Sequence, residues 1–267
     1  MNDRDKLEHE ARAAARAVYI GHDTLLATVL RRFKMFLPAS DVGIVPHLAL
    51  DGFWESWVTC AMLRMVRPGM RVVNVGANVG YYALLFADLV GKDGVVLAVE
   101  PNPDLCMLLD KSKHANGYAQ LCVLRAAVAD AVGDGTMVIP EGYAMNAHLG
   151  DVAGLDGRIV PTLVSTVDGL WVAGRGFASM PDVVFIDAEG AEERIWDGMK
   201  LTREKRDVTI VIEFSPPRYK DAVGFAKKFE QDGFAVGYID DDGAIAWVTA
   251  ERLAAGPEVM AVLRRPR

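Results

Sequence analysis

Acidic residues follow two strand-like runs in the second half of the chain. Asp187 and Glu189 come directly after the apolar run at 183–186, and Glu213 lies near the end of the run VTIVIEF. Alternation along a strand places Asp187 and Glu189 on the same side. Carboxylates in such a place can act as a general base or hold a divalent cation such as Mg²⁺. We therefore treat Asp187 and Glu189 as candidate catalytic residues and Asp187 with Glu213 as candidate metal ligands. The alternative role for Asp187 or Glu189 is to cap the helix predicted from about Ala191.

A glycine-containing loop, VVNVGANVG at 72–80, joins an earlier strand to a helix. Gly76 permits a tight turn and close approach of a ligand, so a side chain there is expected to fill the ligand's space. Glu100 ends the next strand, where an acid can accept hydrogen bonds from both hydroxyls of a ribose. The dinucleotide pattern G-x-G-x-x-G is not matched, because Asn78 stands at the middle position. The pattern predicts a nucleoside-containing ligand other than a dinucleotide; the alternative is that the glycines only form a turn.

Two further residues are candidates for the same site. His148 lies in a loop-like segment and is a candidate general base. Glu55, with Trp54 and Trp57, begins a predicted helix before the first core strand and is placed to roof a bound ligand. Packing alone is the alternative explanation for the two tryptophans.

The elements that must position these residues alternate between strand and helix from residue 70 onward. The runs VVNV, VVLAV, VVFI and VTIVI are apolar at successive positions, which is typical of strands buried on both faces. Strands alternating with helices predict a parallel sheet covered by helices on both faces. We expect residues 1–66 to form a helical N-terminal extension with a lid-like segment, and residues 67–267 to form the α/β domain. Residues 130–165 are rich in glycine and predict a loop or hairpin insertion.

Composition excludes several classes of protein. The 267 residues carry a net charge of −7, which disfavours a nucleic-acid partner. No apolar run reaches the length needed to span a membrane. Three widely separated cysteines predict free thiols, and the charged N-terminus does not resemble a signal peptide, so a cytoplasmic location is expected. A homo-oligomer is left open.

Four segments together resemble the FkbM family of methyltransferases: VVNVGANVGYYALLFADLVGKDGVVLAVEPNP, AAVADAVG, VVFIDAEGAEERIWDGM and IVIEF. The resemblance runs in order and spacing from about Asp51 to Phe214. It implies a Rossmann-like class I methyltransferase fold, with a mostly parallel seven-stranded sheet, and S-adenosylmethionine as cofactor. The cofactor-binding residues that it implies are Asn74, Gly76, Asn78, Gly80, Glu100, Ala127 and Asp130. Of these, positions 74–80 would face the methionine part, Glu100 the ribose, and Ala127 and Asp130 the adenine. Glu55 and Asn102 are two further candidates for binding the cofactor, apart from the resemblance. The family usually has Asp where this chain has Asn74.

The resemblance also implies a reaction. We expect O-methylation of a hydroxyl group on a sugar, glycan or natural product, with a small molecule or glycan as acceptor. The alternatives are N- or C-methylation on the same fold, or a non-catalytic subunit that binds the cofactor. The failed dinucleotide pattern at Asn78 disfavours a nicotinamide dehydrogenase.

Overall fold

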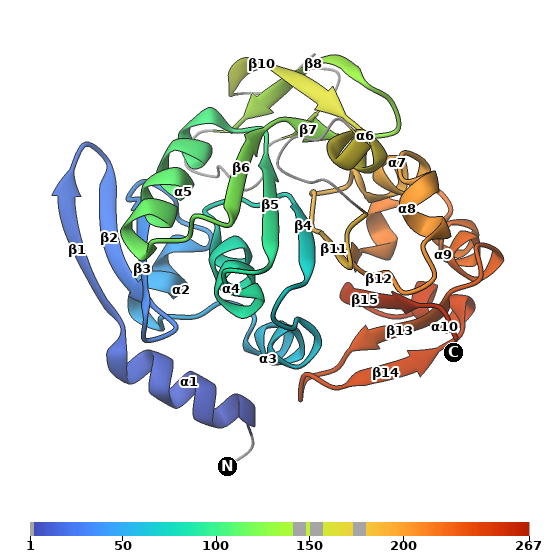
Figure 1. Cartoon of the computed structure of the whole chain (residues 1–267), viewed down its shortest axis with the longest axis horizontal. Coiled ribbons are helices and arrows are strands. Elements are labelled where there is room, and N and C mark those ends of the chain that lie inside the picture. The colour runs from blue at the N-terminus through green and yellow to red at the C-terminus, as the bar shows by residue number, and fades with distance from the viewer. Residues whose placement is uncertain (1–2, 141–147, 150–156, 173–179, 267) are drawn as a thin grey trace.

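The computed structural model describes residues 3–140, 157–172 and 180–266, and the backbone alone of residues 148–149. Its largest feature is a sheet of eight strands within the described residues (Figure 1). In order across the sheet these are β14 (Ile245–Val248), β13 (Ala235–Ile239), β15 (Val259–Arg264), β12 (Thr209–Phe214), β11 (Val183–Ile186), β4 (Arg71–Val75), β5 (Val95–Glu100) and β6 (Leu121–Arg125).

Strand directions confirm the mostly parallel α/β fold. Strands β12, β11, β4, β5 and β6 pair in parallel, whereas β15 is antiparallel to both of its neighbours and β14 is antiparallel to β13. The predicted number of seven strands was one too low. The missing strand is β14, a run of four residues that follows β13 after the tight turn at 240–243. A run of four residues is too short to show a clear alternation of apolar and polar residues, so the sequence did not indicate this strand.

Helices cover both faces of this sheet. Residues of α3 (Ser56–Met65), α4 (Tyr81–Val90) and α5 (Pro103–Asn116) share one apolar core with Val72, whereas the neighbouring Val73 belongs to a second core. That second core also contains residues of α6 (Val167–Val172), α7 (Glu192–Asp197), α9 (Ala222–Gln231) and α10 (Ala250–Ala254). Successive strand residues therefore enter opposite cores, which explains the continuous apolar runs.

The prediction that residues 1–66 are helical was wrong in its middle part. Helix α1 (Asp3–Ala14) and helix α3 bracket a three-stranded antiparallel sheet of β1 (Arg16–Gly21), β2 (Thr24–Val29) and β3 (Phe33–Pro38), followed by α2 (Val45–Leu50). In β3 the alternate residues Phe33, Met35 and Leu37 are completely buried. This period of two indicates a strand, whereas the preceding alanines favour a helix. The segment shares the core of α4 and α5.

The segment at 130–165, predicted as a loop or hairpin insertion, contributes strands to a separate sheet. Strands β8 (Gly133–Ile139) and β10 (Arg158–Ser165) pair antiparallel. With β7 (Ala127–Val128) and β9 (His148–Leu149) they form a four-stranded sheet, which lies beyond the carboxyl end of β6 (Figure 1).

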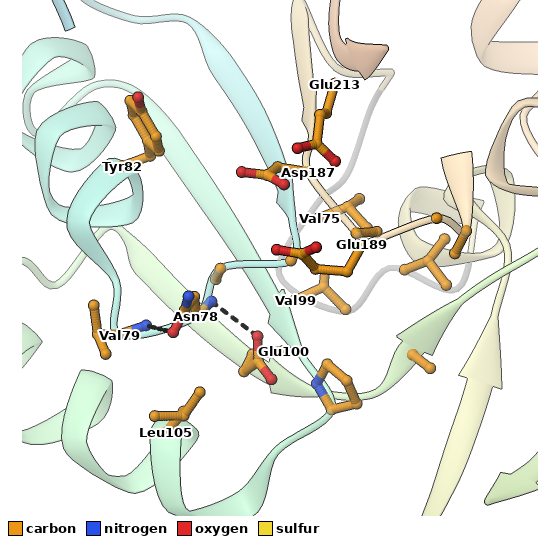
Figure 2. Close-up of a pocket in the computed structure, with 18 of the residues that line it drawn as sticks. Val75, Asn78, Val79, Tyr82, Val99, Glu100, Leu105, Asp187, Glu189 and Glu213 are labelled. Atoms are coloured by element: carbon orange, nitrogen blue, oxygen red, sulfur yellow. Dashed lines mark hydrogen bonds between the residues drawn. The ribbon is translucent and has the colours of Figure 1, made fainter. Parts of the chain in front are cut away.

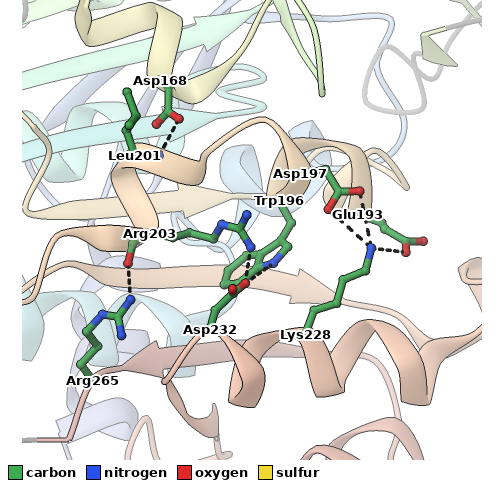
Figure 3. Close-up of polar contacts among 9 residues, drawn as sticks. All are labelled: Asp168, Glu193, Trp196, Asp197, Leu201, Arg203, Lys228, Asp232 and Arg265. Carbon is green, nitrogen blue, oxygen red and sulfur yellow. Dashed lines mark hydrogen bonds and ion pairs between the residues drawn. The ribbon is translucent and has the colours of Figure 1, made fainter.

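Polar contacts tie together the helices that follow β11 (Figure 3). Trp196 of α7 donates its indole N–H to Asp232 at 3.1 Å, and the guanidinium of Arg203, in α8 (Lys200–Glu204), stacks 4.7 Å from the centre of the Trp196 ring. Lys228 of α9 pairs with Glu193 of α7 at 3.0 Å. These contacts fix α7, and with it the loop that connects β11 to α7. No helix among the described residues is both long and apolar enough to cross a membrane.

Gly76, directly after β4, lies against the main chain of the loop after β11. Its φ is +74°, and a Cβ atom at this position would lie 1.7 Å from the carbonyl oxygen of Asp187. The expectation that a side chain here fills ligand space therefore needs correction, because the space is already taken by the protein's own backbone. The glycine permits the carboxyl ends of β4 and β11 to meet.

We predict that Gly76→Ala destabilises the fold, because the new methyl group forces the two strand ends apart. Gly69→Ala is the matched control, since Gly69 has a similar φ of +78° but no atom within 4 Å of its added Cβ. Gly76→Ala should lower the free energy of unfolding by about 1–3 kcal/mol more than Gly69→Ala does. Urea denaturation measures both values, and equal losses would contradict the steric account.

Candidate active site

A cavity of about 470 Å³ opens at the carboxyl ends of β4, β5, β11 and β12. Its volume lies within the usual range for small-molecule and cofactor sites. Figure 2 shows Glu100 and Asn78 on one side and Asp187, Glu189 and Glu213 on the other. The sequence-predicted residues that line the cavity are Glu55, Gly76, Asn78, Glu100, Ala127, Asp187, Glu189 and Glu213.

Glu100 is a buried carboxylate held by main-chain donors. Its two oxygens accept hydrogen bonds from the backbone N–H groups of Asn78 and Asn102, each at 2.8 Å. Burial raises the pKa of Glu100 to about 7, although these two hydrogen bonds oppose the shift. Each carboxylate oxygen can accept a further hydrogen bond. Glu100 is thus poised to bind a pair of hydroxyl groups.

The loop that faces Glu100 has an unusual backbone. Asn78 adopts a left-handed conformation with φ of +50°, and its side-chain oxygen accepts the N–H of Val79 at 2.7 Å. Asparagine tolerates this conformation better than most residues do. Gly80 follows with φ of +92°, and its missing side chain leaves room for Leu109 of α5, 2.1 Å from where a Cβ would be. The loop is therefore shaped by its neighbours before any ligand binds.

The opposite wall of the cavity is acidic. Glu213 and Glu189 share one cation, Arg218, at 2.6 and 3.0 Å. Burial raises the pKa of Glu213 to about 8, even though Arg218 lowers it. Asp187 has no hydrogen-bond donor among the described side chains, and burial, followed by repulsion from Glu213 and Glu55, holds its pKa well above the ordinary range. A carboxylate in this state is a strong proton acceptor once it is ionised.

Glu192, the first residue of α7, holds the loop that precedes this helix. The completely buried Glu192 accepts the backbone N–H groups of Ala188 and Gly190, at 2.9 and 3.2 Å. The N-cap position of α7 is Ala191, which provides no side-chain cap. Asp187 and Glu189 both line the cavity.

Glu55, at the start of α3, also lines the cavity. Its carboxylate accepts the hydroxyl of Tyr82 at 2.7 Å. Burial raises the pKa of Glu55, although the Tyr82 hydrogen bond opposes the shift. Tyr82 itself packs on Phe185 of β11, with ring centres 4.5 Å apart. The roof of the cavity is thereby joined to the sheet beneath it.

Four sequence-predicted residues do not line the cavity. Asn74 is buried in β4, Gly80 starts α4, and Asn102 caps α5 by accepting the N–H of Asp104 at 3.0 Å. Asp130 is exposed and pairs with Arg194 at 2.8 Å. They support the walls of the cavity. His148 lies in β9, and its side chain falls outside the described residues.

The donor set does not support the predicted divalent cation. Among the described residues, no group of three or more His, Cys, Asp or Glu side chains is arranged to hold a metal ion. The positive charge next to Glu213 is the guanidinium of Arg218.

Sequence reasoning missed three residues of the site: Arg218, Glu258 and Tyr82, all of which line the cavity. Arg218 lies after β12, and Glu258 directly precedes β15. Both therefore lie at the edge of the sheet where α/β proteins bind ligands, so the topology could have indicated them. Tyr82 was read only as part of an apolar helix.

Similar proteins are methyltransferases. The family model described as "Methyltransferase FkbM domain" matches residues 74–244. Protein-L-isoaspartate O-methyltransferase 1 of Archaeoglobus fulgidus is 35% identical over 80 residues, which cover 30% of this chain and 33% of that enzyme. Protein-L-isoaspartate O-methyltransferase of Methanopyrus kandleri is 39% identical over 74 residues, covering 28% of this chain and 30% of that enzyme. The chain thus matches about a third of the length of these relatives.

Solved structures of methyltransferases also align with the chain. Methyltransferase FkbM from Methylobacillus flagellatus has a TM-score of 0.49 at 12% identity, over 82% of this chain and 52% of that one. A SAM-dependent methyltransferase from Aquifex aeolicus has a TM-score of 0.42 at 14% identity, over 74% of this chain and 84% of that one.

The family model covers well over half of the chain and includes the glycine loop, Glu100, Asp187 and Glu213. The resemblance seen in the sequence is therefore confirmed, and this chain belongs to the FkbM methyltransferase family.

Proposed function

We propose that this protein transfers a methyl group from S-adenosylmethionine to a hydroxyl group of a sugar, glycan or other natural product. The observation that carries the proposal is that one cavity contains both halves of such a site. Glu100 and the Gly76–Gly80 loop form one side, and the uncompensated acid Asp187 lies on the other. The family supports methyl transfer, and the relatives named above are O-methyltransferases by name.

The residues of the cavity fit this cofactor. Glu100 retains acceptor capacity for the ribose hydroxyls, Ala127 and Leu105 offer apolar surface for the adenine, and the acids near Asp187 suit a positively charged sulfur. When bound, S-adenosylmethionine supplies an activated methyl group.

The protein's part in the reaction is to position the acceptor and to take up a proton. A hydroxyl group beside Asp187 would pass its proton to the Asp187 carboxylate as the oxygen becomes nucleophilic. The raised pKa of Asp187 brings its basicity closer to that of a reacting hydroxyl. Arg218 pairs with Glu189 and Glu213, whereas Asp187 has no cationic partner among the described residues, so we assign the role of proton acceptor to Asp187.

The raised pKa of Asp187 also separates this reaction from the alternatives. A neutral amine acceptor already carries its nucleophilic lone pair and does not require a base of this kind, so the buried acid favours O-methylation over N-methylation. A non-catalytic subunit would have no use for an uncompensated carboxylate, which is costly to keep in a partly dry pocket.

Binding of the cofactor is the first test. We expect purified protein to bind S-adenosylmethionine and S-adenosylhomocysteine in a calorimetric titration, and NAD to give no heat of binding. Tighter binding of NAD would rule out the proposal.

Binding should also release protons through Glu100. Because the pKa of Glu100 is about 7 in the free protein, about half of its carboxyls carry a proton at pH 7. Two ribose hydroxyls donate stronger hydrogen bonds to the ionised form than to the protonated form, so affinity for S-adenosylhomocysteine should rise as pH increases from 6 to 8. Calorimetry in buffers of different ionisation enthalpy counts the released protons at pH 7. Glu100→Gln should bind more weakly and lose this pH dependence; an unchanged dependence would assign the proton to another group.

Asp187→Asn should slow turnover by about 10²–10⁴-fold while leaving the affinity for S-adenosylmethionine nearly unchanged. The substitution keeps the shape of the side chain and removes the proton acceptor. The assay follows labelled methyl groups into a panel of monosaccharides and hydroxylated polyketides, using an acceptor that the wild type modifies. For the wild type, the acid limb of the pH profile of kcat/KM should lie well above the range of an ordinary aspartate, because burial raises the pKa of Asp187. Asp197→Asn, on the surface of α7, is the control. Wild-type turnover in Asp187→Asn would move the role of base to another residue, with His148 next to be tested.

A further inference from the structure

Glu55 is held in a backbone conformation that glutamate rarely adopts. Its φ and ψ are 37° and 65°, in the left-handed region, although it directly precedes the first turn of α3. Such a conformation costs free energy and persists only where the surroundings impose it. Here it directs the carboxylate to Tyr82 and to the wall of the cavity. The contacts that impose it are therefore part of the construction of the site.

The next residue, Ser56, is anchored from outside by helix α1. Ser56 is 1% exposed, and its hydroxyl donates to Glu8 at 2.5 Å while accepting from Arg4 at 2.9 Å. Arg4 also pairs with Glu8 at 2.9 Å, and its guanidinium lies 5.3 Å from the ring centre of Trp57. A buried hydroxyl with both a charged donor and a charged acceptor is strongly fixed.

The loop between β13 and β14 packs against the same turn of α3. Arg4 donates to the carbonyl of Asp241 at 2.6 Å, so helix α1 also holds the loop between β13 and β14. In that loop Gly243 lies so close to α3 that a Cβ would be 2.7 Å from the carbonyl oxygen of Trp57. Helix α1 and this loop together leave the start of α3 little freedom to rotate.

We propose that α1 is a positioning element of the cofactor site: Arg4 and Glu8 fix Ser56, and through it the left-handed backbone that directs Glu55 into the cavity. This inference rests on the proposed function, since it takes S-adenosylmethionine as the ligand that Glu55 faces. Arg4, Glu8, Glu55 and Ser56 all precede residue 74, where the match to the family model begins. The family therefore does not assign them this role.

A double-mutant cycle separates positioning from simple stabilisation. Calorimetry measures the dissociation constant of S-adenosylmethionine for the wild type, Glu8→Ala, Glu55→Gln and the double variant. We expect each single change to weaken binding about tenfold, and Glu8→Ala to have less than about a twofold effect once Glu55 is Gln. Glu10→Ala is the matched control, because Glu10 lies on the same helix but pairs with the exposed Arg31. It should leave the affinity unchanged.

Ser56→Ala is a second variant that removes the central hydroxyl and keeps the Arg4–Glu8 pair. Ser56→Ala should weaken binding as Glu8→Ala does, and it replaces Glu8→Ala in the cycle if that variant does not fold. Thermal unfolding establishes which variants are folded at the temperature of the titration. Equal losses from Glu8→Ala in both backgrounds, or no loss from Glu55→Gln, would overturn the positioning role. Failure of the wild type to bind S-adenosylmethionine would instead overturn the proposed function.

Discussion

The contact between the main chains at Gly76 and Asp187 is the constraint on which the site depends. The parallel strands β4 and β11 end side by side. In the loops that follow them, the main chain of Gly76 lies so close to the carbonyl oxygen of Asp187 that no side chain fits between the two loops. Because Gly76 has no Cβ, the two main chains can approach each other, and the loop that faces Glu100 and the loop that carries Asp187 border the same cavity. Cofactor recognition and proton acceptance can then occur within the same enclosed volume.

Placing several carboxylates around one cavity has an electrostatic consequence. Each is partly removed from water, and burial is the largest influence raising the pKa values of Glu55, Glu100, Asp187 and Glu213. At each position, different partners offset the cost of removing the carboxylate from water. Main-chain donors bind Glu100, Arg218 pairs with Glu213, and Tyr82 donates to Glu55. Among the described residues, Asp187 has no main-chain donor, cation or hydroxyl of this kind. A bound reactant that donates a hydrogen bond would therefore stabilise the charge of Asp187 more than the charges of the other three acids.

The sequence predicted those parts of the structure that have a local signal. Strands buried on both faces, such as 183–186, are continuous apolar runs, and the position of Asp187 and Glu213 at their ends follows from the parallel topology. The strands at 16–38 could not be found in the same way, because β1 is exposed and only β3 alternates clearly. Arg218 and Tyr82 were also missed. Their roles depend on partners far away in sequence or in another element, Glu189 and Glu55, and no short-range pattern records such a pairing.

The origin of the residues around the cavity indicates where acceptor selectivity is built. Glu100 and Asp187 stand at the ends of core strands, and Gly76 follows one directly, so their positions are fixed by the register of the sheet. Trp54 and Glu55 come from the segment before the core, and Met137 comes from the hairpin inserted after β6. Strands β8 and β10 of the hairpin contribute no residue to the two cores of the large sheet, and loops on a rigid scaffold commonly carry specificity. The strand ends therefore suit the part of the reaction that stays constant, which is cofactor binding and proton transfer. In the proposed reaction, the hairpin is the part that can change to fit a particular acceptor, whereas Glu55 of the N-terminal segment belongs to the cofactor site.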